Sequence, residues 1–241
     1  MRKKHQYRGF SLTEVLLAVA TLAVGMVFIS GTFLTGIHFS TIATERSIAA
    51  VVADEAFAKI KIYGINFTDP NLAVDQQARF DLVSLIPATE FAYPSTKILA
   101  EKQYYWSALC RPVYYSPGSR FVQVTVFICR KLGSTTTYPV GAAWPVPVQV
   151  SVTGTVGDSV LTVNDNITYI NDGYTIVENR TGNIYRVLER GADPAHPEQI
   201  TIIQDKKDKP WPGGDSVWVI PPPEGGGKNP CIAVYQKLIS F

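Results

Sequence analysis

The feature that most limits the fold of this chain is a run of 30 residues without a charged side chain, from Val15 to Thr44. A helix rises about 1.5 Å per residue, so this run would be about 45 Å long as a helix. The hydrocarbon core of a membrane needs only about 20 apolar residues. The run can therefore cross a membrane and still extend beyond it.

A basic segment, MRKKHQYRG (1–9), comes directly before the start of this region. It holds four of the 22 Lys and Arg residues and no acidic residue, so its removal would change the formal net charge from +2 to −2. Positive flanks stay on the cytoplasmic side of a spanning helix. We therefore expect a single-pass protein of the inner membrane, with a cytoplasmic N-terminus and a periplasmic bulk.

Glu14 is the residue that two ordinary explanations of this segment leave unexplained. A secretory signal peptide has an apolar region of about 7–15 residues and then small residues at its cleavage site. Here the small residues at 18–20 come too early. A plain signal anchor explains the span and its basic flank, but a carboxylate at the start of a span is unfavourable without a partner. A solvated acid at the membrane interface is the remaining simple interpretation.

The stretch RGFSLTEVLLAVATLAVG (8–25) resembles the leader and mature start of type IV prepilins and type II secretion pseudopilins. A short basic leader ends in Gly9, Phe10 follows, Glu14 comes four residues later, and the apolar run continues from there. Major pilins often carry a proline in this run, whereas this chain has none before Pro70. The stretch is therefore more similar to minor pilins and minor pseudopilins.

The resemblance implies a non-enzymatic structural subunit of a type IV pilus or a type II secretion pseudopilus. A prepilin peptidase would cleave between Gly9 and Phe10 and would N-methylate Phe10. Glu14 would pair with the N-terminal amine of a neighbouring subunit, because a charge in an apolar bundle is tolerated when an opposite charge is supplied. The implied partners are the peptidase, other pilin or pseudopilin subunits and an inner-membrane assembly platform.

After the leader at 1–9, residues 10–64 are predicted to form one long helix. Its second half carries apolar residues at steps of three and four, which predicts one face packed on a sheet. Gly64 is the expected C-terminal stop of the helix. The glycines of the apolar half either loosen the helix or let neighbouring helices approach it closely. They are Gly25, Gly31 and Gly36.

Residues 65–148, completed by 221–241, are predicted to form an antiparallel sheet, so the expected fold class is α+β. Two strand-like runs, 104–115 and 120–131, read as a β-hairpin. The last residues, 231–241, read as another strand. A short helix is also expected near 75–86.

The second strand of the hairpin carries aliphatic residues at every other position. They are Val122, Val124, Val126 and Ile128. Because alternate side chains of a strand share one face, we expect this face to cover the long helix.

A small all-β domain is predicted at 149–220, inserted before the last strand. Proline- and glycine-rich crossings, 138–148 and 221–230, bracket it. Seven short strand-like runs within it, NITYI (166–170) among them, predict a barrel or a sandwich. NRTGN (179–183) reads as a hairpin turn. The pilin resemblance does not extend to this insertion.

No pattern for catalysis or metal binding is visible in the sequence. His5, His38 and His196 lie far apart, no CxxC occurs, and no nucleotide-binding or nucleophile-elbow pattern is present. An exported hydrolase would need a nucleophile and a base, which we do not find. A charged stretch at 205–211 reads as an exposed turn. We expect no enzymatic activity, no cofactor and no nucleic-acid partner.

The three cysteines, Cys110, Cys129 and Cys231, lie in or beside the predicted strands of the sheet. An exported location permits one disulfide, and three cysteines leave one thiol over. We favour a Cys129–Cys231 pair, because central and final strands are often neighbours. Three buried thiols are the alternative.

A second functional hypothesis is a membrane-anchored binding module. In it, residues 149–220 bind a ligand outside the cytoplasm and the helix serves only as a tether. The sequence leaves the kind of filament open among a pilus, a secretion system and a DNA-uptake apparatus.

Overall fold

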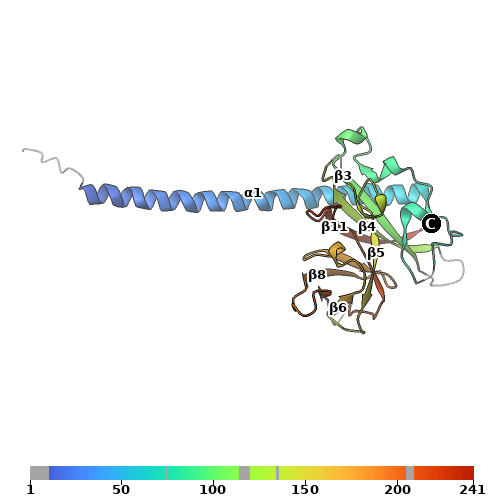
Figure 1. Ribbon diagram of the computed structural model, residues 1–241. Helices are drawn as coiled ribbons and strands as arrows, with labels where there is room; N and C mark the ends of the chain where they lie inside the picture. The colour runs from blue at the N-terminus through green and yellow to red at the C-terminus, as the bar shows by residue number, and fades with distance from the viewer. Residues whose placement is uncertain (1–10, 74, 114–119, 134–135, 205–208) are drawn as a thin grey trace, which may run out of the picture. The chain divides into compact units, whose positions relative to one another are not determined.

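The computed structural model describes residues 11–73, 75–113, 120–133, 136–204 and 209–241 (Figure 1). The chain divides into two units, Met1–Ser47 and Ile48–Phe241, and the boundary falls inside the long helix. The elements are α1 (Leu12–Tyr63), β1 (Ala78–Arg79), α2 (Phe80–Val83), η1 (Ala88–Phe91), β2 (Ala92–Tyr93), η2 (Leu99–Glu101), β3 (Tyr104–Pro112), β4 (Phe121–Arg130), η3 (Pro139–Gly141), β5 (Val148–Thr153), β6 (Val160–Val163), η4 (Ile167–Tyr169), β7 (Thr175–Glu178), β8 (Ile184–Arg190), β9 (Gln199–Ile203), β10 (Ser216–Val219) and β11 (Cys231–Ser240), where η marks a 3₁₀ turn.

The long helix α1 is continuous and ends where the sequence predicted. The backbone N–H of Gly64 donates to the carbonyl of Ile60 at 3.0 Å, and Gly64 has a φ of +69°. This left-handed conformation is the usual C-terminal stop of a helix and favours glycine, which has no Cβ. The glycines of the apolar half lie inside the unbroken helix.

The larger sheet is antiparallel and has the order β1–β3–β4–β11, with β2 also paired to β3. β3 and β4 pair along their length, from Tyr104 opposite Arg130 to Pro112 opposite Val122, which confirms the predicted hairpin. β11 pairs with the other edge of β4, so the last segment of the chain completes the sheet. The helix expected near 75–86 is wrong in extent. The chain there forms β1 and the four-residue α2, because Ala78 and Arg79 pair with β3.

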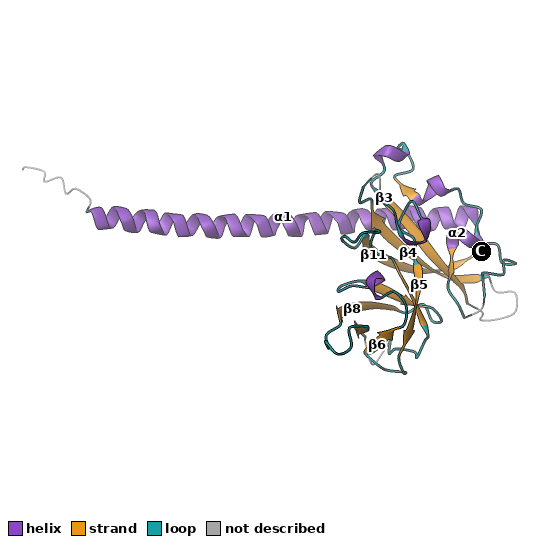
Figure 2. Cartoon of the chain, viewed as in Figure 1, coloured by secondary structure: helices purple, strands orange, loops and turns teal. Residues whose placement is uncertain are grey.

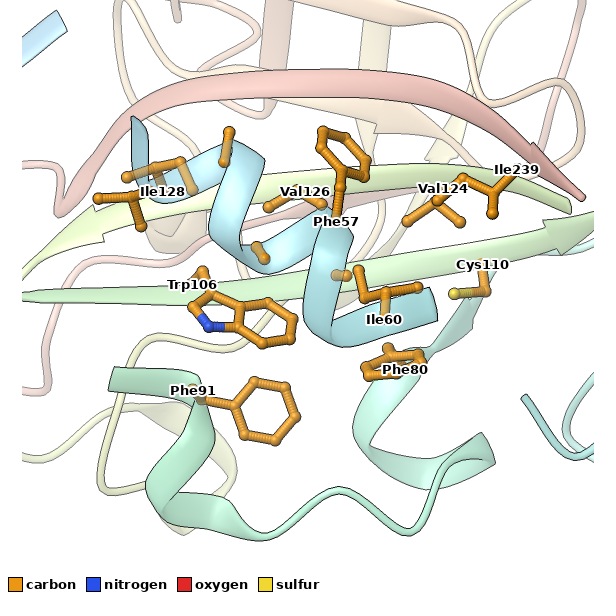
Figure 3. Packing of buried hydrophobic residues seen from close by; sticks show 14 of the residues in the cluster. Phe57, Ile60, Phe80, Phe91, Trp106, Cys110, Val124, Val126, Ile128 and Ile239 are labelled. Carbon is orange, nitrogen blue, oxygen red and sulfur yellow. The ribbon is translucent and has the colours of Figure 1, made fainter. Parts of the chain in front are cut away.

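One face of this sheet packs against the second half of α1 (Figure 3). The alternating aliphatic residues of β4, from Val122 to Ile128, belong to the same buried cluster as Phe57 and Ile60 of the helix. Small helix residues bring the backbone close to the sheet, and Trp106, Phe80 and Phe91 close the side of the core. The small residues are Ala49, Ala53 and Ala56, all at most 2% exposed.

A buried lysine fixes the segment around η1 against the helix. Lys59 of α1 lies 3.0 Å from both Glu55 and Glu90 carboxylates, and it donates to the carbonyl of Glu90 at 2.8 Å. The indole N–H of Trp106 donates to the same carbonyl at 2.9 Å. The ammonium is therefore partnered despite being withdrawn from solvent, as a buried charge must be.

The inserted segment forms a closed antiparallel barrel in the order β10–β5–β6–β9–β8–β7. Figure 2 labels three of these strands, β5, β6 and β8. Its interior holds side chains from every strand, including Val150, Leu161, Ile176 and Ile200. The β7–β8 hairpin turns through 179–183, as predicted for NRTGN. Closure leaves none of these six strands with an open edge.

One of the seven strand-like runs was interpreted wrongly. NITYI (166–170) contains the 3₁₀ turn η4 and no strand. The side-chain oxygen of Asn166 accepts from the backbone N–H of Thr168 at 3.1 Å and also from its hydroxyl. Asparagine readily forms such local bonds, which compete with strand pairing.

The second face of the sheet is buried against the barrel, which the sequence analysis did not foresee. Leu109, Phe127 and Cys129 of the sheet form one cluster with Val177 and Trp218 of the barrel. The turn after β7 adds polar contacts. Gln236 donates to the carbonyl of Gly182 at 2.8 Å, and the backbone N–H of Gln77 donates to the carbonyl of Asn179 at 3.1 Å.

Candidate functional site

Within the first unit of the chain, residues 12–47 are the exposed half of α1, and their surface is mainly apolar. Large side chains such as Leu16, Phe28 and Phe33 are 62–71% exposed. An 18-residue window of this helix has a mean hydropathy of 2.3, and none of it is buried. Among the described residues, α1 is the one helix long and apolar enough to cross a membrane.

Several hydroxyl groups of this apolar half are satisfied within the helix itself. They donate to a backbone carbonyl three or four residues earlier, as in Thr21 to Leu17 at 3.0 Å and Ser30 to Met26 at 2.8 Å. Thr32, Thr35 and Thr41 do the same. An unpaired hydroxyl in hydrocarbon is unfavourable, so this pattern suits a helix in an apolar environment.

Glu14 lies in the first turn of α1 and takes part in a capping box. Its Oε2 accepts from the backbone N–H of Ser11 at 2.9 Å, and the Ser11 hydroxyl accepts from the backbone N–H of Glu14 at 3.2 Å. Both amides belong to the group that an α-helix leaves unpaired at its start. Glu14 therefore takes part in a helix cap that the sequence analysis missed, although the pattern S-x-x-E at 11–14 predicts such a cap.

The other residues of the expected processing site, Gly9 and Phe10, lie outside the described residues, as do the basic leader and its His5. Cleavage and methylation there stay predictions. The helix that follows begins at Leu12, and its first turn holds the acidic Glu14, which also suits the positive end of the helix dipole.

The favoured cysteine pair lies side by side in the sheet. Cys129 of β4 is directly opposite Cys231 of β11, and both are free thiols in the structure. The neighbouring pair is hydrogen-bonded, with the N–H of Arg130 donating to the carbonyl of Pro230 at 2.9 Å. The Cys129–Cys231 position is therefore a non-hydrogen-bonded one, where side chains of an antiparallel pair approach most closely.

Burial raises the pKa of the Cys129 thiol, and a thiol–thiol contact with Cys231 raises it further. Cys110 is also fully buried, and burial raises its pKa. It packs with the helix side of the sheet, in a different cluster from Cys129. Cys110 therefore lies apart from Cys129 and Cys231, which face each other.

The remaining candidates for chemistry stay apart. His38 is exposed on α1, and His196 contacts Glu198 at 3.2 Å in an exposed turn. Within the described residues no group of three His, Cys, Asp or Glu side chains is arranged to hold a metal ion. Most of the charged stretch at 205–211 lies outside the described residues.

Comparison with known proteins adds no relative. No family model matches the chain, no curated protein matches it, and no solved structure matches it.

Proposed function

We propose that the chain is a non-enzymatic structural subunit of a type IV pilus or a type II secretion pseudopilus. In this account a prepilin peptidase cleaves between Gly9 and Phe10, and the N-terminal helix then assembles with the helices of other subunits on an inner-membrane platform. The resemblance at residues 8–25 motivates the proposal.

The observation that carries the proposal is the change in surroundings along α1. Its residues up to Ser47 are almost entirely exposed and mostly apolar, whereas those from Ala49 to Ile60 bury one face on a sheet. A helix exposed on all sides with this composition requires lipid or other helices around it. A filament subunit would place this half of the helix first in lipid and then among the helices of other subunits.

Glu14 supports the same proposal because the capping box uses only one of its two carboxylate oxygens. Oε2 is used by the Ser11 amide, while Oε1 can accept a second partner. The N-terminal amine of a neighbouring subunit is a partner of opposite charge. Pairing would lower the cost of placing this carboxylate in an apolar bundle.

In vivo photo-crosslinking from Phe28 tests the proposal. Phe28 is 71% exposed on the apolar half of α1, so a photoreactive phenylalanine there reports what surrounds the helix. We expect adducts with other subunits that carry a similar apolar N-terminal helix. A photoreactive residue at Leu188, exposed on the barrel, is the control. Adducts with lipid alone at position 28 would contradict assembly through the helix.

A membrane-anchored binding module is a second candidate function, and one observation favours it. The closed barrel has its own core of fourteen buried residues, which is more than a spacer between sheet strands requires. In that case the same photoreactive Phe28 would give lipid adducts, and the barrel would carry the activity.

A further inference from the structure

Neither function explains a cavity of about 510 Å³ in the second unit, Ile48–Phe241. It lies where the chain enters and leaves the barrel. Its walls come from the η3 loop, the η4 turn, the end of β8 and the segment 222–227. We call it the junction cavity. Its size is within the range of small-molecule sites, about 300–1,000 Å³.

Hydrogen bonds within the chain hold one wall of the junction cavity in place. Pro222 and Pro223 are buried, and the next residue ties the two crossings together. The N–H of Glu224 donates to the carbonyl of Thr137 at 3.0 Å, and the Thr137 hydroxyl donates to Glu224 Oε2 at 2.9 Å. A preformed wall lowers the entropy lost on binding.

A strained residue lies on the rim. Val140 has φ +63° and ψ +20°, and its side chain is 67% exposed. The left-handed region is a clear outlier for a β-branched residue. A bridge between Tyr138 and Ala142 closes the loop around it. Strain of this kind gathers at ligand clamps, where the surrounding structure holds it in place.

The polar groups in the cavity are mostly neutral. Asn166, Thr168 and Asn171 contribute amide and hydroxyl groups. One cation, Arg190, and one anion, Glu224, balance each other. Arg190 donates from Nη1 to the carbonyls of Ile167 and Ile170 at 3.2 and 3.3 Å, and a guanidinium group has further N–H donors that can serve a ligand. The balance of charge disfavours a strongly anionic or cationic ligand.

Tyr169 gives the cavity its aromatic surface. The residue is half-buried, because one side of it packs on the barrel core while it also lines the cavity. A half-exposed ring offers a flat apolar face beside polar groups. The C–H face of a pyranose fits such a ring, and planar amide, carboxylate and guanidinium groups match neighbouring sugar hydroxyls.

A peptide fits this place less well. Peptides commonly add a strand to an open sheet edge, and the six barrel strands have none. Recognition of a proline-rich peptide needs a groove lined by several aromatic residues, whereas the cavity has Tyr169 alone among its described lining residues. We propose that the junction cavity binds a neutral oligosaccharide, with Tyr169 stacking on a sugar ring and Asn171, Arg190 and Glu224 holding its hydroxyls.

Calorimetric titration of the full chain tests this proposal. The protein is kept in a polyoxyethylene detergent, because a sugar-based detergent would compete for the site. The probes are cellotetraose, chitotetraose and maltotetraose, each up to about 5 mM, which detects even weak binding. We expect at least one of them to bind.

Three variants locate the site. Tyr169→Ala should weaken binding about ten-fold or more, while Tyr169→Phe, which keeps the ring, should stay within about two-fold of the wild type. Tyr63→Ala, an exposed tyrosine on α1, should bind as the wild type does. Circular dichroism and thermal unfolding check the fold of each variant. If Tyr169→Ala does not fold, the exposed Glu224→Ala replaces it and should weaken binding several-fold.

Three results would overturn the proposal. The first is no binding of any of the three oligosaccharides. The second is equal binding by the wild type and by a folded Tyr169→Ala or Glu224→Ala variant. The third is binding of decaproline in place of the sugars, which would assign the cavity to a peptide.

Discussion

Ser11 and Glu14 exchange hydrogen bonds at the start of α1, each side chain accepting from the other's backbone amide at 3.2 and 2.9 Å. The same carboxylate is the one that a filament would use to bind a neighbouring N-terminus. Under the proposed function, Glu14 would have a second role beside the capping box. The capping box needs only an acceptor oxygen, and the proposed pairing would need a negative charge.

Glutamine separates the two roles. Glu14→Gln keeps an acceptor for the Ser11 amide, because glutamine also forms capping boxes, but it removes the charge. Glu14→Ala removes both, at a cost of about 1 kcal/mol in helix stability. We expect Gln to preserve slow hydrogen exchange at the start of α1 and to lose the crosslinks from Phe28, whereas Ala loses both. Wild-type crosslinking by Glu14→Gln would contradict the pairing role.

The facing thiols of Cys129 and Cys231 lead to a prediction about oxidation. We expect the protein isolated from an oxidising compartment to carry a disulfide between them, because they lie opposite each other in neighbouring strands. Its intact mass should be lower by two hydrogen atoms than after reduction. Cys110→Ala should keep this difference and Cys129→Ala should abolish it. Alkylation of all three cysteines without prior reduction would contradict the pairing.

Cys110 predicts a loss of stability at alkaline pH. Burial raises the pKa of its thiol above the ordinary value of 9.0. Below pH 9.0 the thiol is protonated in both states, so this group adds no pH dependence. Above it the unfolded chain releases the proton and the folded chain keeps it, so the free energy of unfolding falls by about 1.4 kcal/mol per pH unit.

Urea unfolding near pH 8 and near pH 10 measures this loss. The wild type should lose about 1 kcal/mol more than Cys110→Ala between the two values, because the variant has no thiol to ionise at this position. The buried tyrosines titrate in both proteins and cancel in the comparison. An equal loss in both proteins would show that Cys110 is not the source.

Val140 predicts a stabilising substitution. Its left-handed backbone is strained, whereas glycine adopts that conformation freely. We expect Val140→Gly to raise the free energy of unfolding by about 1 kcal/mol, since the relief exceeds the added chain entropy. Val156 is 72% exposed and is not among the residues with positive φ, so Val156→Gly should lower stability. The same sign for both changes would argue against strain at Val140.

Much of the fold was predictable because its signals are local. The charge-free run, the step of three and four in the second half of α1 and the alternation in β4 each reflect one face of one element. Gly64 and the turn at 179–183 were recognisable from backbone chemistry. These features depend little on what packs elsewhere in the chain.

One error comes from a local side-chain bond, and the others arise where contacts between distant segments decide the structure. NITYI has the composition of a strand, but the Asn166 side chain closes a turn there. Residues 78–79 pair with β3, which shortens the expected helix. The alternation in β4 identifies one buried face, and the burial of Phe127 and Cys129 on the other face depends on the barrel.

The candidate sites also differ in how far the sequence predicts them. The S-x-x-E pattern at 11–14 predicts the capping box, and the expected strand order predicts that Cys129 and Cys231 lie close together. The junction cavity was not readable, because four segments separated by up to about 90 residues in sequence form its walls. Each segment alone reads as an ordinary turn or crossing.

The central claim is that the chain is processed as a prepilin. The mass of the N-terminal peptide, measured on protein purified from its native membrane, tests it most directly. The account predicts a chain that begins at N-methylated Phe10, without the nine-residue leader 1–9. A chain that keeps Met1, or one that begins after residue 23, would contradict it.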